Sequence, residues 1–473
     1  MKDGVTPENN AASELLKVVG PSQIAPDESE QFFKSLGIPQ LPAEGDYFLR
    51  WEDWRAYLLS QRHDIANLSE DQKKALLEPL MGEIGQLNAS FEQATLGPWK
   101  SAENPIINEW LEANDIPLQA VAKAVEIPRF FLPVIRSGPR KPLDVNRVGV
   151  RKNVEDLALA LNVRAMRNLG EGKEDTAWKD LQIATQIGQL FNTSSLGTDG
   201  WIGSEIELQA IRSMLIYLAK TEPDAAFCQT QLAKLSERMA NAVPMAQRLD
   251  TAERMEMLDA VCLEAKGVER ASYNGLPPNN PILVDWNFQL KFLNQKLDNA
   301  IKAAAVVDPR QRQLALQSFD SEIEQLRSEF LSWEEEDSSH AGRKTLTNQS
   351  FAEWLVTERL PLVVFLVGYE SQVQTNRNLL RLALALAWYK AEIGKYPAAL
   401  TDLVPKFLPA IPVDDFHGHP FSYQLKPDGY LLYSFGQNGI DEQGANAESD
   451  PSSRADDITA RVPAVKPVPP PKE

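Results

Sequence analysis

The sequence is poor in cysteine. Cys228 and Cys262 are the only two cysteines among 473 residues. This number excludes a disulfide framework of the kind that holds small secreted domains together, and it excludes a zinc site built from four thiolates. The two thiols could bridge neighbouring helices in an exported protein, or they could lie buried and reduced. The redox compartment therefore stays open at this point.

Basic residues are also in short supply. The chain holds 48 Lys and Arg residues against 66 Asp and Glu residues, which gives a formal net charge of -18. Such a charge repels phosphate backbones and anionic lipid headgroups. We therefore expect neither nucleic acid nor a membrane surface as a partner. Carboxylates gathered in one loop could still hold a hard cation.

Long apolar runs are absent too. The most apolar stretch, residues 360–368, is about half of the ~20 residues needed to cross a bilayer, and it is typical of a buried helical segment. The first ten residues carry neither the basic region nor the apolar region of a signal peptide. We predict no membrane span in the chain as given.

Recognisable catalytic motifs are missing. The sequence contains no nucleophile elbow, Walker loop, dinucleotide-binding glycine turn or His-Glu-x-x-His helix. His417 and His419 stand close to Asp414 and could ligate a metal, but a turn flanked by glycine and proline is the simpler interpretation. Glu256 and Asp259 lie one helical turn apart and could pair for acid–base chemistry, but this spacing is common on solvated helix faces. We predict that the protein is not an enzyme.

What the sequence does contain is helical periodicity. Its length and its 43% apolar content exceed what one hydrophobic core usually supports, so we expect two or more packed units. Apolar residues recur at helical spacing from Ala11 to about Pro133, and the prolines and glycine of residues 128–142 indicate a boundary. We predict an N-terminal helical region over residues 1–137 and a helical body over residues 143–370.

The body begins with a predicted αα-hairpin. Apolar residues share one helical face over residues 157–169, glycines 170 and 172 end that helix, and the stripe restarts over residues 177–191. The hairpin resembles a tetratricopeptide unit, but no second copy follows at a period of about 34 residues. At least six helices are expected between residues 153 and 370. Tryptophans on helical stripes or at helix starts are assigned to the core: Trp110, Trp178, Trp201, Trp286, Trp354 and Trp388.

Several helix starts can be predicted from residues that cap unpaired backbone amides. Asp285 precedes one helical stripe, and Asp308 precedes another with proline at the favoured first position. Two further pairs have the spacing of capping boxes: Ser204 with Glu207, and Asp250 with Glu253.

The pattern changes in the last hundred residues. Apolar residues step by three and four from Leu379 to Ile393 on more than one face, which predicts a helix packed on several sides. Residues 421–425 alternate as a strand does, residues 426–429 form a turn, and residues 430–435 form the return strand. We predict a mainly α protein with a small C-terminal α+β module over residues 371–460, with its only substantial β-structure between Phe421 and Phe435. A proline-rich, disordered tail is predicted over residues 461–473.

Ordered short motifs in this module resemble the globular head of the major pseudopilin of type II secretion systems. The resemblance covers less than a fifth of the chain. It is carried by Trp388-Tyr389-Lys390, Gly394-Lys395-Tyr396-Pro397, Leu408-Pro409, Asp414, Gly418, Pro420-Phe421-Ser422-Tyr423, Tyr433-Ser434-Phe435-Gly436 and Asn438-Gly439. The helical bulk is similar to large uncharacterised proteins of planctomycete-type bacteria that end in such a module, with landmarks at Asn9-Asn10-Ala11-Ala12, Trp110-Leu111 and Ala177-Trp178.

The chain also departs from the pseudopilin pattern. Major pseudopilins begin with a cleavable leader, a phenylalanine, a glutamate at the fifth mature position and a long apolar spine, and the chain as given shows none of these. A conventional pseudopilin is therefore not expected. If a leader and an apolar helix lie upstream of Met1, we expect an exported or membrane-anchored protein; otherwise we expect a cytoplasmic one.

The resemblance implies a calcium site in the loop after the hairpin. Short-range acids on a glycine-containing loop can wrap calcium, which takes roughly six to eight oxygen ligands in flexible geometry. Family members usually carry aspartate where Asn438 stands. By position against the pattern, the expected ligands are Asn438, Asp441, Asp456 and Asp457, with Asp450 and the carbonyl of Phe435 in reserve. The alternative is a solvated acidic loop.

Two hypotheses for function follow. The first is a non-catalytic structural or secretion-associated protein whose helical body carries a calcium-binding, pseudopilin-like head that docks on an unknown protein partner. The second is a helical, tetratricopeptide-like interaction scaffold unrelated to secretion, in which the head is a borrowed folding module. In either case we expect the long helix ending near Ile393 to join body and head as one rigid unit.

Overall fold

The computed structural model describes residues 5–22, 24, 26–62, 70–133, 148–194, 196–239, 242–266, 284–338, 347–446 and 454–464. The predicted boundary between residues 137 and 143, Asp450 and most of the predicted tail lie outside these residues. The helices are α1 (Ala11–Val19), α2 (Pro26–Leu36), α3 (Trp51–Arg62), α4 (Glu70–Leu96), α5 (Pro105–Ala113), α6 (Asp115–Ala124), α7 (Val148–Gly170), α8 (Glu174–Phe191), α9 (Gly197–Lys220), α10 (Ala225–Met239), α11 (Met245–Arg248), α12 (Arg254–Ala265), α13 (Trp286–Ala304), α14 (Pro309–Ser338), α15 (Asn348–Arg359) and α16 (Pro361–Ile393).

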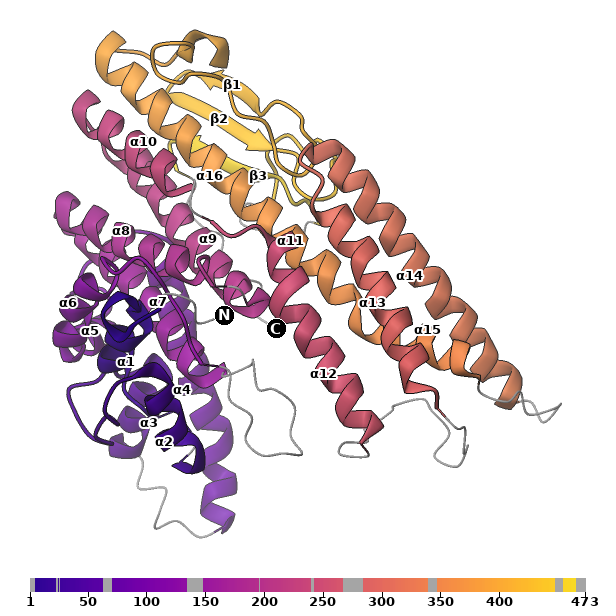
Figure 1. Cartoon of the computed structure of the whole chain (residues 1–473). Coiled ribbons are helices and arrows are strands. Elements are labelled where there is room, and N and C mark those ends of the chain that lie inside the picture. The colour runs from indigo at the N-terminus through magenta and orange to yellow at the C-terminus, as the bar shows by residue number, and fades with distance from the viewer. Residues whose placement is uncertain are drawn as a thin grey trace.

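The predicted αα-hairpin is confirmed as α7 and α8, and α9 packs against both (Figure 1). Glycines let α8 and α9 approach closely: a Cβ on Gly188 would come within 2.6 Å of the carbonyl oxygen of Gly203, and the reverse holds as well. Helices α1–α6 lie against the outer side of this group (Figure 1).

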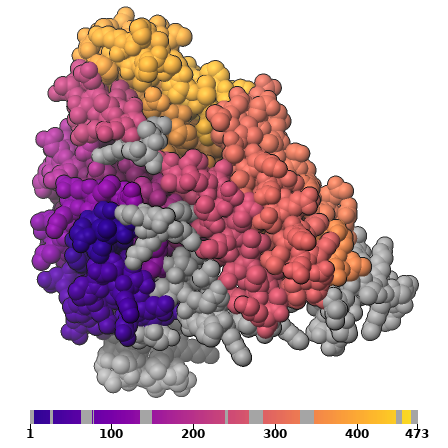
Figure 2. All heavy atoms as spheres, in the orientation of Figure 1, coloured from indigo at the N-terminus to yellow at the C-terminus, as the bar shows by residue number. Residues whose placement is uncertain are grey.

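A second group of helices, α12–α15 with the first half of α16, forms the opposite flank of the molecule (Figure 1). The space-filling view shows the N-terminal helices and this second group on opposite sides of one face, with the C-terminal module above them (Figure 2). The cap predicted at Asp285 is confirmed, because its carboxylate accepts bonds from the amides of Asn287 and Phe288. Helix α14 starts at Pro309, as predicted, and Asp308 accepts a bond from the amide of Gln311.

Both predicted capping boxes are wrong. Ser204 lies in the second turn of a helix that already began at Gly197, and its hydroxyl donates to the carbonyl of Gly200. Residues Leu249–Glu253 form a π-helical turn that joins α11 to α12 without a break. The caps failed because the preceding residues continue the helix, so the amides in question are not orphaned.

The C-terminal module packs α16 against an antiparallel sheet in the order β1 (Ser422–Lys426), β2 (Gly429–Ser434) and β3 (Ile458–Val462) (Figure 1). The mainly α fold with a small C-terminal α+β module is confirmed, and so is the hairpin. The expectation of no further strand was wrong. In β3, Ala460 is buried opposite Leu432, so the hairpin needs this strand to cover its second edge. The strand ends at Val462, two residues into the predicted tail.

Helix α16 joins the two parts of the chain. Its first half lies in a core with α11–α15, which includes Val363, Leu366 and Val367. Its second half lies in a larger core that also contains α1, α7–α9 and the sheet, as shown by Leu382 and Leu386. The C-terminal module therefore shares its core with the N-terminal helices.

The assignments of single residue types have mixed outcomes. Trp110, Trp178 and Trp354 are buried, and the other three predicted core tryptophans are half-buried. Both cysteines are free thiols, Cys228 buried and Cys262 half-buried, and burial raises the pKa of Cys228 to about 12.

Among the helices that the structure describes, none is long and apolar enough for a transmembrane span.

Candidate metal centre

The loop between β2 and β3 brings two of the four predicted ligands against its backbone. Asp456 Oδ2 accepts bonds from the amides of Gln437 and Asn438, at 3.0 and 3.1 Å. Asp457 Oδ2 accepts from the amide of Gly444 at 2.7 Å. The turn requires glycine at position 436, where φ is +63° and a Cβ would lie 2.3 Å from the carbonyl oxygen of Asp456. The two aspartates thus close the loop with one oxygen each.

The other two predicted ligands are engaged in local turns. Asn438 Oδ1 accepts from the amide of Ile440 at 2.6 Å, and Asn438 Nδ2 donates to Glu442 at 2.7 Å. Asp441 Oδ1 accepts from the amide of Gln443 at 2.9 Å and from the hydroxyl of Tyr433 at 3.1 Å. These bonds shape the loop around the carboxylates.

Glu442 is the residue that sequence reasoning missed. Three buried carboxylate oxygens in this loop have no hydrogen-bond partner among the described residues: Glu442 Oε2, Asp456 Oδ1 and Asp457 Oδ1. Asp457 is only 1% exposed. Glu442 directly follows a predicted ligand, so an acid count along the loop could have included it. Buried carboxylate oxygens without donors are costly unless a cation or a proton neutralises them.

The electrostatics of the loop reflect this cost. Burial raises the pKa of Asp457 from its ordinary value of 3.8 to about 7, and the nearby carboxyl of Glu442 and the negative charge of Asp441 act in the same direction. Burial also raises the pKa of Asp456, and the charge of Glu442 adds to this. The carboxyls of Glu442 and Asp457 can bond to each other only when one of them is protonated. A bound cation would remove the need for that proton.

These side chains do not form a complete ligand shell by themselves. In the described ranges of the chain, no three or more His, Cys, Asp or Glu side chains are arranged so that they could hold a metal ion. His417 lies in a turn, and its ring contacts the carbonyl of Gln437 at 3.1 Å. Glu256 and Asp259 lie half-buried on α12. A cation in the loop would need further oxygens from backbone carbonyls or water, which calcium accepts readily.

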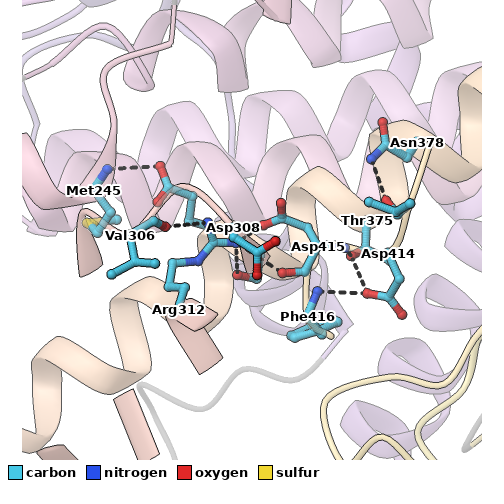
Figure 3. Close-up of polar contacts among 12 residues, drawn as sticks. Met245, Val306, Asp308, Arg312, Thr375, Asn378, Asp414, Asp415 and Phe416 are labelled. Atoms are coloured by element: carbon cyan, nitrogen blue, oxygen red, sulfur yellow. Dashed lines mark hydrogen bonds and ion pairs between the residues drawn. The ribbon is translucent and has the colours of Figure 1, made fainter. Parts of the chain in front are cut away.

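A second polar cluster surrounds Asp414 (Figure 3). Asp414 Oδ1 accepts from the hydroxyl of Thr375 on α16 and from the amide of Phe416, at 3.2 and 2.7 Å. Asp414 Oδ2 accepts from the hydroxyl of Ser434, which in turn accepts from the amide of Gly436. This chain of bonds connects the long helix to the start of the loop.

The neighbouring Asp415 ties the module to the second helix group (Figure 3). Arg312 on α14 donates to the carboxylate of Asp415 at 2.6 Å and to its carbonyl at 3.0 Å. Burial raises the pKa of Asp415 to about 6, and the positive charge of Arg312 opposes that rise. The contact joins elements about a hundred residues apart.

We predict that, in a chelator, the free energy of unfolding falls as the pH rises from about 4 to about 7. The folded-state pKa values of Asp415 and Asp457 lie above their ordinary 3.8, so the folded state binds more protons in this window and loses stability as they leave. Denaturant unfolding at several pH values checks this. The Asp457→Asn variant should lose the slope between about pH 5 and pH 7 that Asp457 contributes. An unchanged profile would refute the assignment.

A third set of buried charges lies in the body, away from the loop. Asp199 pairs with Arg151, and Glu207 pairs with Arg377 of α16. Arg248 donates to the carbonyl of Asn192 at 2.6 Å. Glu253, read as a capping residue, is buried and accepts from the amide of Gly197 at 2.8 Å. These bonds hold α7, α9, α11, the π-helical turn and α16 together.

Comparisons of the chain with protein-family models, with curated proteins and with solved structures found no match. The resemblance to a pseudopilin head therefore stays a prediction, and the chemistry of the loop is the main basis for a function.

Proposed function

We propose that the protein is a non-catalytic structural or secretion-associated protein whose C-terminal module is stabilised by one calcium ion in the loop between β2 and β3. The observation that carries the proposal is the set of three buried carboxylate oxygens without partners, on Glu442, Asp456 and Asp457. Hard carboxylate oxygens on a flexible glycine-containing loop suit calcium better than softer metals. In this proposal Asn438 and Asp441 shape the loop, and the ion takes oxygens from one or two of the three acids at a time, with backbone carbonyls and water completing its ligand shell.

The module's place in the fold links calcium to the rest of the molecule. The hydrogen bonds from Gly436 through Ser434 and Asp414 reach Thr375 on α16, and Arg312 binds Asp415 next to it. An ordered loop would therefore favour one position of the module on the body. This would give a partner protein a single rigid surface to bind.

Thermal unfolding of the full chain tests the calcium site. We expect weak binding, with a dissociation constant on the order of 10⁻⁴ M as in extracellular modules. Binding to the folded state alone then adds about 2.7 kcal/mol at a hundredfold excess over that constant. The unfolding midpoint should rise in millimolar calcium relative to chelator, and magnesium should have a smaller effect because it demands stricter octahedral geometry.

Matched variants make the result specific. Glu442→Gln and Asp457→Asn should abolish the calcium-dependent rise, whereas Asp428→Asn, which changes an exposed acid in the turn between β1 and β2, should preserve it. A midpoint that ignores calcium in the parent protein would overturn the site. Co-purification from the source organism, in calcium and in chelator, tests the structural role; an identical set of proteins in both conditions would count against it.

A further inference from the structure

A pocket of about 200 Å³ lies in the body, far along the chain from the loop discussed above. It forms where the end of α8 meets the segment after α6, the linker before α11 and helix α16. Ile127 and Ala242 contribute apolar surface, and Gln186, Gln189 and Arg377 contribute polar surface. This volume holds several water-sized groups and hence a small organic molecule.

Arg377 gives the pocket a specific chemistry. Its side chain is about nine-tenths buried and donates from Nη2 to Glu207. Its Nε is buried without a partner, and no described residue accepts a bond from Nη1. Because Nε is sealed from solvent and Nη2 donates to Glu207, Nη1 is the nitrogen that an oxygen ligand in the pocket can approach.

Helix α8 supplies neutral hydrogen-bonding groups to the lining of the pocket. Gln186 and Gln189 lie three residues apart on α8 and are half-buried, and their side chains make no hydrogen bond to any residue that the structure describes. Asn192 continues this wall by one more turn and is held in place by Arg248. Two amide side chains and one guanidinium thus line a partly apolar pocket, which is the usual composition of a small-ligand site.

We propose that this pocket binds a small organic monocarboxylate with a short apolar skeleton. The carboxylate would accept from Arg377, the apolar skeleton would lie against Ile127, and the glutamines would bind a second polar group if the ligand has one. A dianion such as phosphate is disfavoured, because Glu207 lies against the same guanidinium and the chain has a net charge of -18. The proposal is independent of the calcium site.

Ligand titration of the full chain in chelator, followed by saturation-transfer NMR, tests this proposal with isovalerate as the probe. Isovaleramide has the same shape without the charge and serves as the matched control. We expect isovalerate to bind with a dissociation constant of about 1 mM, and isovaleramide to bind at least tenfold more weakly. Inorganic phosphate should not compete with isovalerate.

Two variants locate the binding. Ala242→Phe fills the pocket from a half-buried linker position and should abolish the signal. Gln189→Leu should weaken binding severalfold for a probe with an added keto group, 2-oxoisovalerate, and should leave isovalerate nearly unchanged. Equal signals from isovalerate and isovaleramide, an absent signal for both, or full binding by Ala242→Phe would each overturn the proposal.

Discussion

Replacing Asp199 by alanine is expected to lower the free energy of unfolding by about 3–5 kcal/mol, because the buried guanidinium of Arg151 then loses the carboxylate with which it pairs. Asp199 is fully buried and pairs with Arg151, which is only 2% exposed. Nη1 of Arg151 already lacks a partner, so loss of the Asp199 carboxylate would remove the acid that hydrogen-bonds this guanidinium and leave only the more distant charge of Glu253. Denaturant unfolding of parent and variant measures the difference.

Controls separate this effect from a general sensitivity of the fold. The double variant Arg151→Met/Asp199→Asn removes both charges and keeps an acceptor for the hydroxyl of Ser194, which bonds Asp199. It should recover most of the lost stability. Lys17→Ala breaks an ion pair whose lysine side chain is 51% exposed, and it should cost at most about 1 kcal/mol. A double variant as unstable as Asp199→Ala would contradict this account.

Truncating Leu382 to alanine is expected to destabilise body and module together, by about 2–5 kcal/mol. Leu382 lies fully buried on α16, in the core that contains both α9 and the sheet. The cavity would weaken both sides of the helix at once. Hydrogen exchange should therefore show amides of α9 and of β2 losing protection in parallel.

Leu362→Ala provides the matched control on the same helix. Leu362 is 43% exposed, so its truncation should change stability by no more than about 1 kcal/mol. If Leu382→Ala released the sheet while α9 kept full protection, the module would be an independent unit. The expectation of one rigid unit would then be wrong.

Local patterns in the sequence were enough to predict most of the secondary structure. The αα-hairpin, the start of α13 at Asp285 and the hairpin of β1 and β2 depend on periodicity and on contacts within a few residues. Each of these signals lies within one continuous stretch of sequence. The prediction therefore did not need to know what packs against the segment.

The failures share a different physical origin. Strand β3 pairs with β2 across a long acidic loop. The residues near Ile458–Val462 contain no local pattern that indicates β2 as the pairing strand. Glu207 has the spacing of a cap but is buried against Arg377, 170 residues away. A charged residue in a polar-looking stretch is assigned to the surface unless its distant partner is known.

The features of the candidate site also separate into those that local sequence shows and those that depend on contacts between distant residues. The sequence by itself determined that acids and glycines gather after the hairpin, that the fold is mainly helical and that the chain is strongly acidic. Only the tertiary structure decided which carboxylates are buried, that Glu442 joins Asp456 and Asp457 without a donor for their remaining oxygens, and that α16 places the module in the same core as the N-terminal helices. Burial and charge pairing are properties of groups brought together from distant parts of the chain, and a local pattern does not contain them.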